Sequence, residues 1–158
     1  MANENIDEHW GFETTAIHAG QKPDPQTGAV TVPVYQTTTY EQDAVGKDRG
    51  YEYSRTGNPT RTALEISIAA LEGAKFGRAF ASGMAAEDTI LRLLNPGDHI
   101  VMGNDAYGGT FRLISKVLNR MGVTWSAVDL SRRENIEKNI NGNTRIVWAE
   151  TPSNPLLA

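Results

Sequence analysis

The chain of 158 residues carries 15 Lys and Arg against 19 Asp and Glu, which gives a formal net charge of −4. Its length suits one domain with its own core, and 39% hydrophobic with 22% charged residues is typical of a globular protein. The acidic balance argues against a general nucleic-acid binder, because such proteins usually present a basic face. The absence of Cys excludes a disulfide scaffold, a thiolate metal site and a cysteine nucleophile.

No apolar run approaches the ~18 residues that a membrane span needs, and the polar, acidic beginning lacks the basic-then-apolar layout of a secretory signal. We therefore expect a cytoplasmic protein. The histidines show no metal-ligand spacing, so we expect no metal site. His99 falls in a predicted strand, and we interpret it as a structural residue.

The first sixty residues differ from the rest of the chain. No helical period persists between Lys22 and Thr60, and this stretch holds four of the seven prolines, at positions 23, 25, 33 and 59. Val32–Tyr35 and Tyr51–Tyr53 are nevertheless too apolar and aromatic for a floppy tail. We therefore predict that residues 1–60 form an extended arm that packs on a neighbouring subunit.

Residues 61–158 alternate regularly between helix and strand patterns. The first helix has Asn58 as its N-cap and Pro59 at the first helical position; Leu64, Ile68 and Leu71 share one face, and Gly73 ends it. The pattern then predicts strands over Arg78–Ala81, His99–Met102, Val123–Val128 and Arg145–Ala149, and helices over 83–94, Gly108–Arg120 and Arg132–Ile140. This alternation is typical of an α/β fold with a mostly parallel sheet.

The last predicted strand is followed by Glu150-Thr151-Pro152-Ser153-Asn154-Pro155 and three further residues. In open α/β sheets ligands bind beyond the carboxyl ends of the strands. The sequence thus stops inside an expected active-site loop, and we expect it to be the N-terminal portion of a longer protein.

Three loops contain residues suited to an anionic ligand. Ser82, Gly83 and Met84 join a strand to a helix, whose first N–H groups and dipole favour a phosphate; small residues at such a turn also serve packing alone. Tyr107 follows the strand 99–102, where its ring can cover a ligand in the crevice or pack at the sheet edge.

Arg112 stands one turn into the next helix, where it can reach an anionic substrate or lie in solvent. In the arm, Tyr53 and Arg55 are two residues apart in extended chain, so both point to one side. A phenol and a guanidinium together suit a phosphate, and a local surface pair is the alternative.

Together these segments resemble the trans-sulfuration, or Cys/Met-metabolism, family of pyridoxal-phosphate enzymes, whose members share the aspartate-aminotransferase-like fold type I. Six blocks in the right order cover nearly the whole chain: Thr15–Gly20, Pro33–Thr38, Tyr53–Thr60, Ser82–Ala86, Asp105–Thr110 and Glu150–Pro155. Within the family they look most like the bacterial cystathionine γ-synthases, especially the actinobacterial form.

The resemblance implies a role for each matching position. Ser82, Gly83 and Met84 would hold the cofactor phosphate, Tyr107 would stack on the pyridine ring and take part in proton transfer, and Asn154 would contact the ring hydroxyl. Tyr53 and Arg55 would reach the phosphate of the neighbouring subunit's cofactor, in a homotetramer built from dimers that share active sites. Glu52 and Arg112 match positions near the substrate.

The activity implied is γ-replacement, in which an activated homoserine ester and cysteine give cystathionine. A cystathionine γ-lyase and an O-acyl-homoserine sulfhydrylase share these blocks. Methionine γ-lyase is disfavoured, because that subfamily typically has Cys where this chain has Gly109. The family's cofactor-linking lysine lies downstream of the last block, and Lys22, Lys47, Lys75, Lys116 and Lys138 match no such position. A non-catalytic fragment is therefore the alternative class for the 158-residue chain itself.

Overall fold

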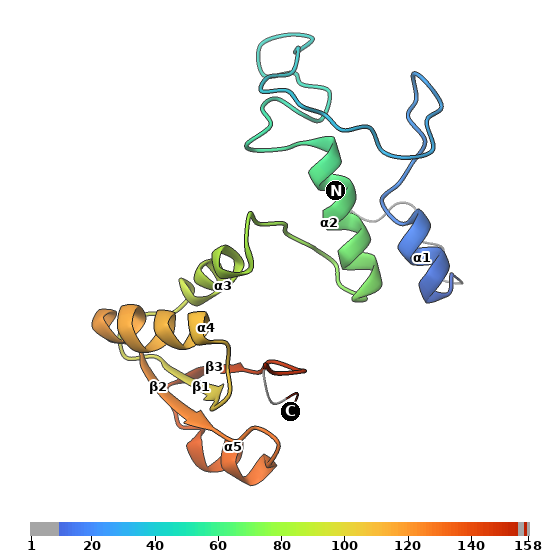
Figure 1. The fold of residues 1–158 in the computed structure, drawn as a ribbon. Coiled ribbons are helices and arrows are strands. Elements are labelled where there is room, and N and C mark those ends of the chain that lie inside the picture. The colour runs from blue at the N-terminus through green and yellow to red at the C-terminus, as the bar shows by residue number, and fades with distance from the viewer. Residues whose placement is uncertain (1–9, 155–156, 158) are drawn as a thin grey trace. The chain divides into compact units, whose positions relative to one another are not determined.

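The computed structural model describes residues 10–154 and 157, so predictions on residues 1–9, 155–156 and 158 lie outside the described part. The chain forms two compact units, Met1–Ala79 and Phe80–Ala158 (Figure 1). The predicted arm and the helix that follows it belong to the N-terminal unit.

The N-terminal unit contains two helices, α1 (Phe12–His18) and α2 (Pro59–Leu71), which pack against each other. Gly20 follows α1 with a φ of +77°, and a Cβ there would stand 3.1 Å from Cβ of Ile66 on α2, so only glycine permits this approach. The predicted cap of α2 is confirmed, since Asn58 Oδ1 accepts the N–H of Thr60 at 2.9 Å. The helix α1 was not predicted, because seven residues show little periodicity.

The long loop between α1 and α2 is held by local bonds rather than by a core. Tyr53 forms an antiparallel bridge with Thr39. Near its start, the backbone N–H and the hydroxyl of Thr27 donate to Asp24 and lower the pKa of that carboxyl. The loop thus contains turns and two isolated bridges and no helix or longer strand, and its packing on a neighbouring subunit stays a prediction.

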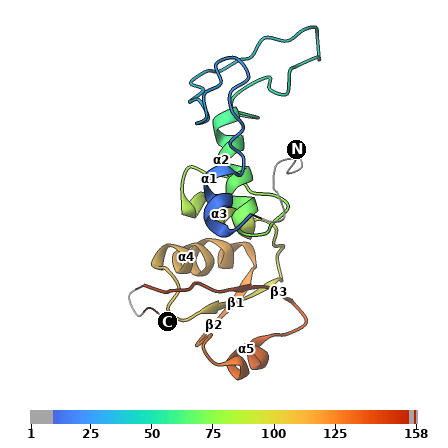
Figure 2. The same cartoon turned by 90° about the vertical axis from the view of Figure 1, so that its right-hand side faces the viewer.

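The C-terminal unit is a three-stranded, wholly parallel sheet with strand order β2-β1-β3. Its strands are β1 (His99–Gly103), β2 (Thr124–Val128) and β3 (Thr144–Trp148). Helices α3 (Gly83–Leu91) and α4 (Gly108–Arg112) lie on one side, and α5 (Arg133–Asn139) lies on the other side of the sheet (Figure 2). The predicted α/β fold with a parallel sheet is confirmed.

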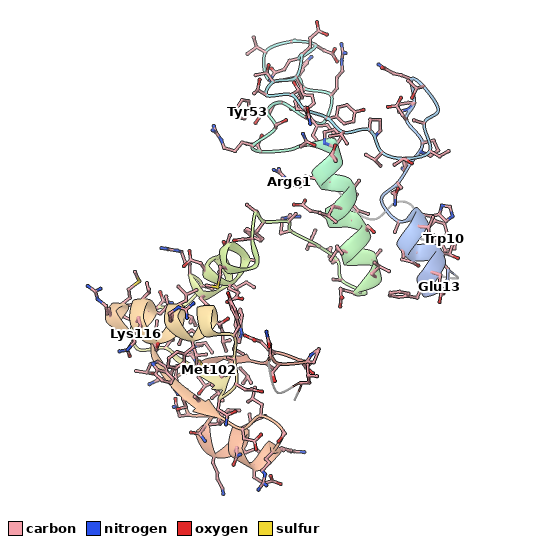
Figure 3. The ribbon with its side chains drawn as sticks, viewed as in Figure 1. Trp10, Glu13, Tyr53, Arg61, Met102 and Lys116 are labelled. Atoms are coloured by element: carbon pink, nitrogen blue, oxygen red, sulfur yellow. The ribbon has the colours of Figure 1, made fainter. Side chains whose placement is uncertain are left out.

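The core of this unit lies between β1 and the helices on one face. All five residues of β1 are buried, and Met102 lies beneath the helical layer (Figure 3). The buried apolar cluster consists of Leu91, Ile100, Met102, Ile114, Leu118 and Val123. The helix after α4 continues irregularly as η1 (Leu113–Val117) and η2 (Leu118–Met121), a π turn followed by a 3-10 turn, so the predicted helix 108–120 is present but not uniformly α.

The structure confirms the expectation for His99 and contradicts the strand predicted at 78–81. His99 is 5% exposed and lies 2.9 Å from Thr144 Oγ1 and 3.0 Å from Ser126 Oγ through its two ring nitrogens, so its structural interpretation is confirmed. The predicted strand Arg78–Ala81 is wrong for the described chain, in which no strand pairs with it. The N–H of Ala79 donates instead to Glu65 Oε1 at 3.0 Å.

Among the described residues, no helix combines the length and the apolar character that crossing a membrane requires.

Candidate functional site

The N-terminus of α3 offers the groups that an anion needs. Ser82 is the N-cap, and its Oγ accepts the N–H of Ala85 at 3.1 Å. The N–H groups of Gly83 and Met84 have no acceptor inside the helix, because the first turn never does. A Cβ built at Gly83 would meet nothing within 4 Å. Open space therefore adjoins the positive end of a nine-residue helix.

Tyr107 lies beside this turn, in the loop between β1 and α4. The residue is 53% exposed. A Cβ built at Gly109 would stand 3.0 Å from Cδ1 of Tyr107 and 2.8 Å from Sδ of Met84. The structure thus brings together two predicted site residues that are far apart in sequence, and Gly109 leaves the room for both.

Glu150, which follows β3, was not singled out from the sequence, yet it joins the same loops. Its Oε2 accepts the backbone N–H of Tyr107 at 2.8 Å, and its Oε1 accepts Nε1–H of Trp148 at 3.1 Å. Thr110 Oγ1 lies 3.3 Å from the same Oε1 and donates to Glu87 Oε2 at 2.7 Å. The bond to Tyr107 spans 43 residues, so no local sequence signal could reveal it.

The other predicted residues of this unit lie on the same loops. Arg112 is exposed, and a Cβ at Gly108 would stand 3.2 Å from its Nη1, so its guanidinium lies over the start of α4. Asn154 is exposed in the turn after β3. The adjacent Ser153 is buried, at 2% exposure.

The arm residues form a separate group in the N-terminal unit. The guanidinium carbon of Arg55 lies 4.8 Å from the ring centroid of Tyr53, which agrees with the prediction that both point to one side. Glu52 is exposed. Arg61 on α2 (Figure 3) was not predicted, but it donates to the carbonyls of residues 54, 55 and 56 at 3.3, 3.4 and 3.1 Å. It therefore fixes the loop that carries Arg55.

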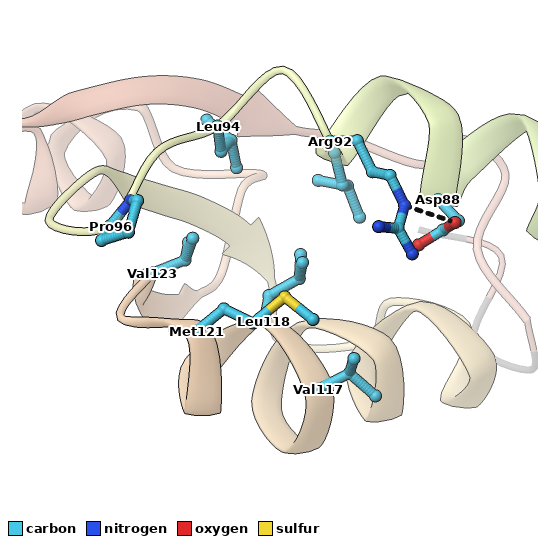
Figure 4. Close-up of a pocket in the computed structure, with 9 residues that line it drawn as sticks. Asp88, Arg92, Leu94, Pro96, Val117, Leu118, Met121 and Val123 are labelled. Carbon is cyan, nitrogen blue, oxygen red and sulfur yellow. Dashed lines mark hydrogen bonds and ion pairs between the residues drawn. The ribbon is translucent and has the colours of Figure 1, made fainter.

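A cavity of about 290 Å³ lies elsewhere in the C-terminal unit, between α3 and the irregular helix η1–η2 (Figure 4). Its walls are mainly aliphatic, and Arg92 pairs with Asp88 at 3.0 Å on one side. None of the predicted site residues lines it, so it is not a candidate for the cofactor. No group of three or more potential metal ligands occurs within residues 10–154 and 157.

Comparison with protein families matches residues 13–158 to the Cys/Met metabolism PLP-dependent enzymes. The chain belongs to this family. Its members depend on pyridoxal 5′-phosphate, so the question is whether the residues of the site fit this cofactor. The expected family and cofactor are confirmed.

Relatives within the Cys/Met metabolism family include the cystathionine γ-synthase of Mycobacterium tuberculosis, 57% identical over 150 residues that cover 94% of this chain and 39% of the relative. The cystathionine γ-lyase of Bacillus subtilis is 53% identical over 145 residues, covering 92% of this chain and 38% of the relative. Other relatives are named cystathionine β-lyases. The chain thus spans less than half the length of the curated relatives it matches.

The crystal structure of metB from Corynebacterium glutamicum matches with a TM-score of 0.93 and 53% identity, covering 97% of this chain and 40% of that structure. The fold of the Cys/Met metabolism family is therefore confirmed for this chain. The names of the relatives support an enzyme of cystathionine metabolism and do not separate the synthase from the lyases.

The residues present fit part of the cofactor. A phosphate fits the open N-terminus of α3, and an aromatic ring fits beside Tyr107. The five lysines are all exposed, and none has a contact with the Met84–Tyr107–Glu150 cluster among the described interactions. Among the described residues, an open helix N-terminus fits the phosphate and an aromatic side chain fits the ring, and no lysine has a described interaction with this cluster.

Proposed function

We propose that the protein containing this chain is a cytoplasmic, pyridoxal-phosphate-dependent cystathionine γ-synthase. It would join an activated homoserine ester to cysteine: the Cγ–O bond breaks, the acyl group leaves as a carboxylate, and a Cγ–S bond forms with the cysteine sulfur. The observation that carries the proposal is the placement of Tyr107 beside Met84, at the open end of α3. It supports the proposal because an open helix N-terminus suited to a phosphate and an aromatic face lie within the same loop cluster.

The cofactor, when bound, supplies an electron sink for charge that develops on the substrate carbons. The N–H groups of Gly83 and Met84, with Ser82, would bind its phosphate. The ring of Tyr107 would stack on the pyridine, its phenol oxygen would hold or move a proton, and Asn154 would contact the ring hydroxyl. Arg112 and Glu52 would each contact the substrate.

Oligomer assembly completes the proposed site. Tyr53 and Arg55 reach the cofactor phosphate of a neighbouring subunit, in a homotetramer built from dimers. The exposed guanidinium of Arg55 supports this proposal, since a phosphate held across an interface needs a charge that is free to pair with it. A lysine outside this chain attaches the cofactor, so the 158-residue chain alone would be inactive.

The test uses the full-length protein with cysteine and an acylated homoserine, and measures cystathionine by mass spectrometry. Cystathionine formed at the expense of the ester supports the proposal. The 53% identity to a γ-lyase makes cystathionine cleavage the second candidate, measured by incubation with cystathionine alone. Replacing cysteine with sulfide detects a sulfhydrylase. If the ester is not consumed while cystathionine is cleaved, the synthase assignment is wrong.

A further inference from the structure

The carboxylate of Glu150 connects two chain segments that the proposed site requires, the loop before α4 and the end of β3. Thr110 of α4 lies 3.3 Å from the same carboxylate and bonds to α3. Tyr107 and Trp148 donate to different oxygens of the one carboxylate, at 2.8 and 3.1 Å. An ionised carboxylate accepts at both oxygens, so it satisfies both donors at once.

Thr110 extends this connection to the helix that begins at the phosphate turn. Its side chain is fully buried, so its hydroxyl has no access to water. A hydroxyl carries one hydrogen, and the shorter contact, 2.7 Å to Glu87 Oε2, marks the acceptor. Glu87 lies on α3 one turn after Gly83, so α3 and α4 are joined through this bond.

Tyr107 itself has few other restraints. The residue is more than half exposed, and its backbone N–H is the group that Glu150 holds. Since Tyr107 is the N-cap of α4, fixing its backbone fixes the direction in which the ring leaves the chain. The ring then lies over Gly109, and Met84 Sδ borders the same space.

We propose that Glu150 is a positioning residue, which holds the Tyr107 ring at a set place relative to the N-terminus of α3. This inference rests on the proposed function, because the position matters only if the two groups bind one cofactor. Gln can satisfy only one of the two donors, because its amide has a single acceptor oxygen and its NH2 group would face the other N–H. Misplacement of a reacting or stacking group by about 1 Å can reduce turnover on the order of a hundredfold.

The experiment measures cofactor retention and turnover in the full-length holoenzyme. Retention is followed by dialysis and by the visible circular dichroism of the bound cofactor, which depends on the orientation of the ring. Glu150→Gln is compared with Glu137→Gln, which alters an exposed carboxylate that pairs with Arg133. We expect Glu150→Gln to change the dichroism and to lower turnover on the order of ten- to a hundredfold, and Glu137→Gln to match the parent.

A double mutant separates positioning from a general structural role. If Glu150 acts through the Tyr107 ring, Glu150→Gln added to Tyr107→Ala changes retention by less than about twofold, because the ring is already gone. The thermal unfolding shift of Glu150→Gln persists in both backgrounds, since the backbone bond is present in both. Equal losses of retention in both backgrounds, or no loss in either, overturn the proposal.

Failure of the proposed function and failure of a variant to fold can each be told apart from failure of the positioning role. If the parent protein retains no pyridoxal phosphate, the proposed function fails and the positioning role fails with it. If Glu150→Gln does not fold, Glu150→Asp replaces it, because Asp keeps the charge and is one methylene too short to hold the Tyr107 N–H in the same place. Changed dichroism with lowered retention in Glu150→Asp supports the proposal, and parental values of both contradict it.

Discussion

Replacing Gly109 with Ala tests how closely the Tyr107 ring is placed. The added methyl carbon would stand 2.8 Å from Met84 Sδ and 3.0 Å from Tyr107 Cδ1, which is tighter than van der Waals contact allows. Something must move, and the ring of Tyr107, a residue 53% exposed, can turn outward. We therefore expect the substitution to displace the ring rather than to unfold the loop.

The expected changes in the free energy of unfolding and in cofactor affinity follow from the separate costs and gains of the added methyl. Forcing a methyl into a packed site costs about 1–3 kcal/mol, but a ring that can be pushed toward solvent lowers that cost, and Ala is favoured over Gly in a helix by roughly 0.5–1 kcal/mol. The free energy of unfolding should thus change by less than about 1 kcal/mol. Loss of ring stacking removes about 0.5–1.5 kcal/mol, which corresponds to cofactor affinity weakened roughly 2- to 13-fold.

The assay is equilibrium dialysis of pyridoxal phosphate against the full-length protein, alongside urea unfolding of the same samples. Gly142→Ala is the matched control, because a Cβ there would meet nothing within 4 Å. Gly109→Ala with parental affinity would refute the reasoning, because the ring would then not be in the place that the cofactor requires. A loss of several kcal/mol in stability would refute it as well, since the ring would not have moved.

The remaining predictions concern three other residues. Tyr107→Phe should retain the cofactor and lose turnover, because it keeps the aromatic face and removes the phenol, whereas Tyr107→Ala should lose both; parental turnover in both variants would leave the residue only structural. Arg61→Ala should weaken cofactor retention, because the loop of residues 54–56 loses three bonds to one guanidinium. Arg61→Lys should restore part of the retention, and unchanged retention in Arg61→Ala would contradict a role of Arg61 in fixing the loop. His99→Leu should lower the free energy of unfolding by about 1–3 kcal/mol through two lost hydrogen bonds without changing the affinity for the cofactor, which calorimetry can check; a specific loss of affinity would instead indicate a role in the site.

Local signals in the sequence predicted much of the fold. The Asn58–Pro59 pair located the start of α2, and the apolar run at 100–102 located the central strand. The strand expected at 78–81 failed for a physical reason: a strand exists only with a neighbour to pair with, and no neighbour is present in the described chain. Propensity alone cannot supply that partner.

In the candidate site too, residues with a local sequence signal were predicted, and residues whose role depends on contacts between distant segments were not. Ser82, Gly83 and Tyr107 were predicted because each stands at a junction between a strand pattern and a helix pattern. Glu150 was missed because its bond to Tyr107 depends on β1 and β3 being neighbours in the sheet. The residues of either strand alone do not predict which strands pair. Arg61 was missed because a helical arginine is usually solvated, and only the folded loop brings three carbonyls to it.

The central claim is that the start of α3 and Tyr107 hold one pyridoxal phosphate between them. A crystal structure of the full-length protein with its cofactor tests this most directly. We predict that phosphate oxygens lie within hydrogen-bond distance, about 2.7–3.2 Å, of the N–H groups of Gly83 and Met84, with the Tyr107 ring stacked on the pyridine. A cofactor bound with its phosphate away from these two N–H groups, or with Tyr107 turned from the ring, would contradict the account.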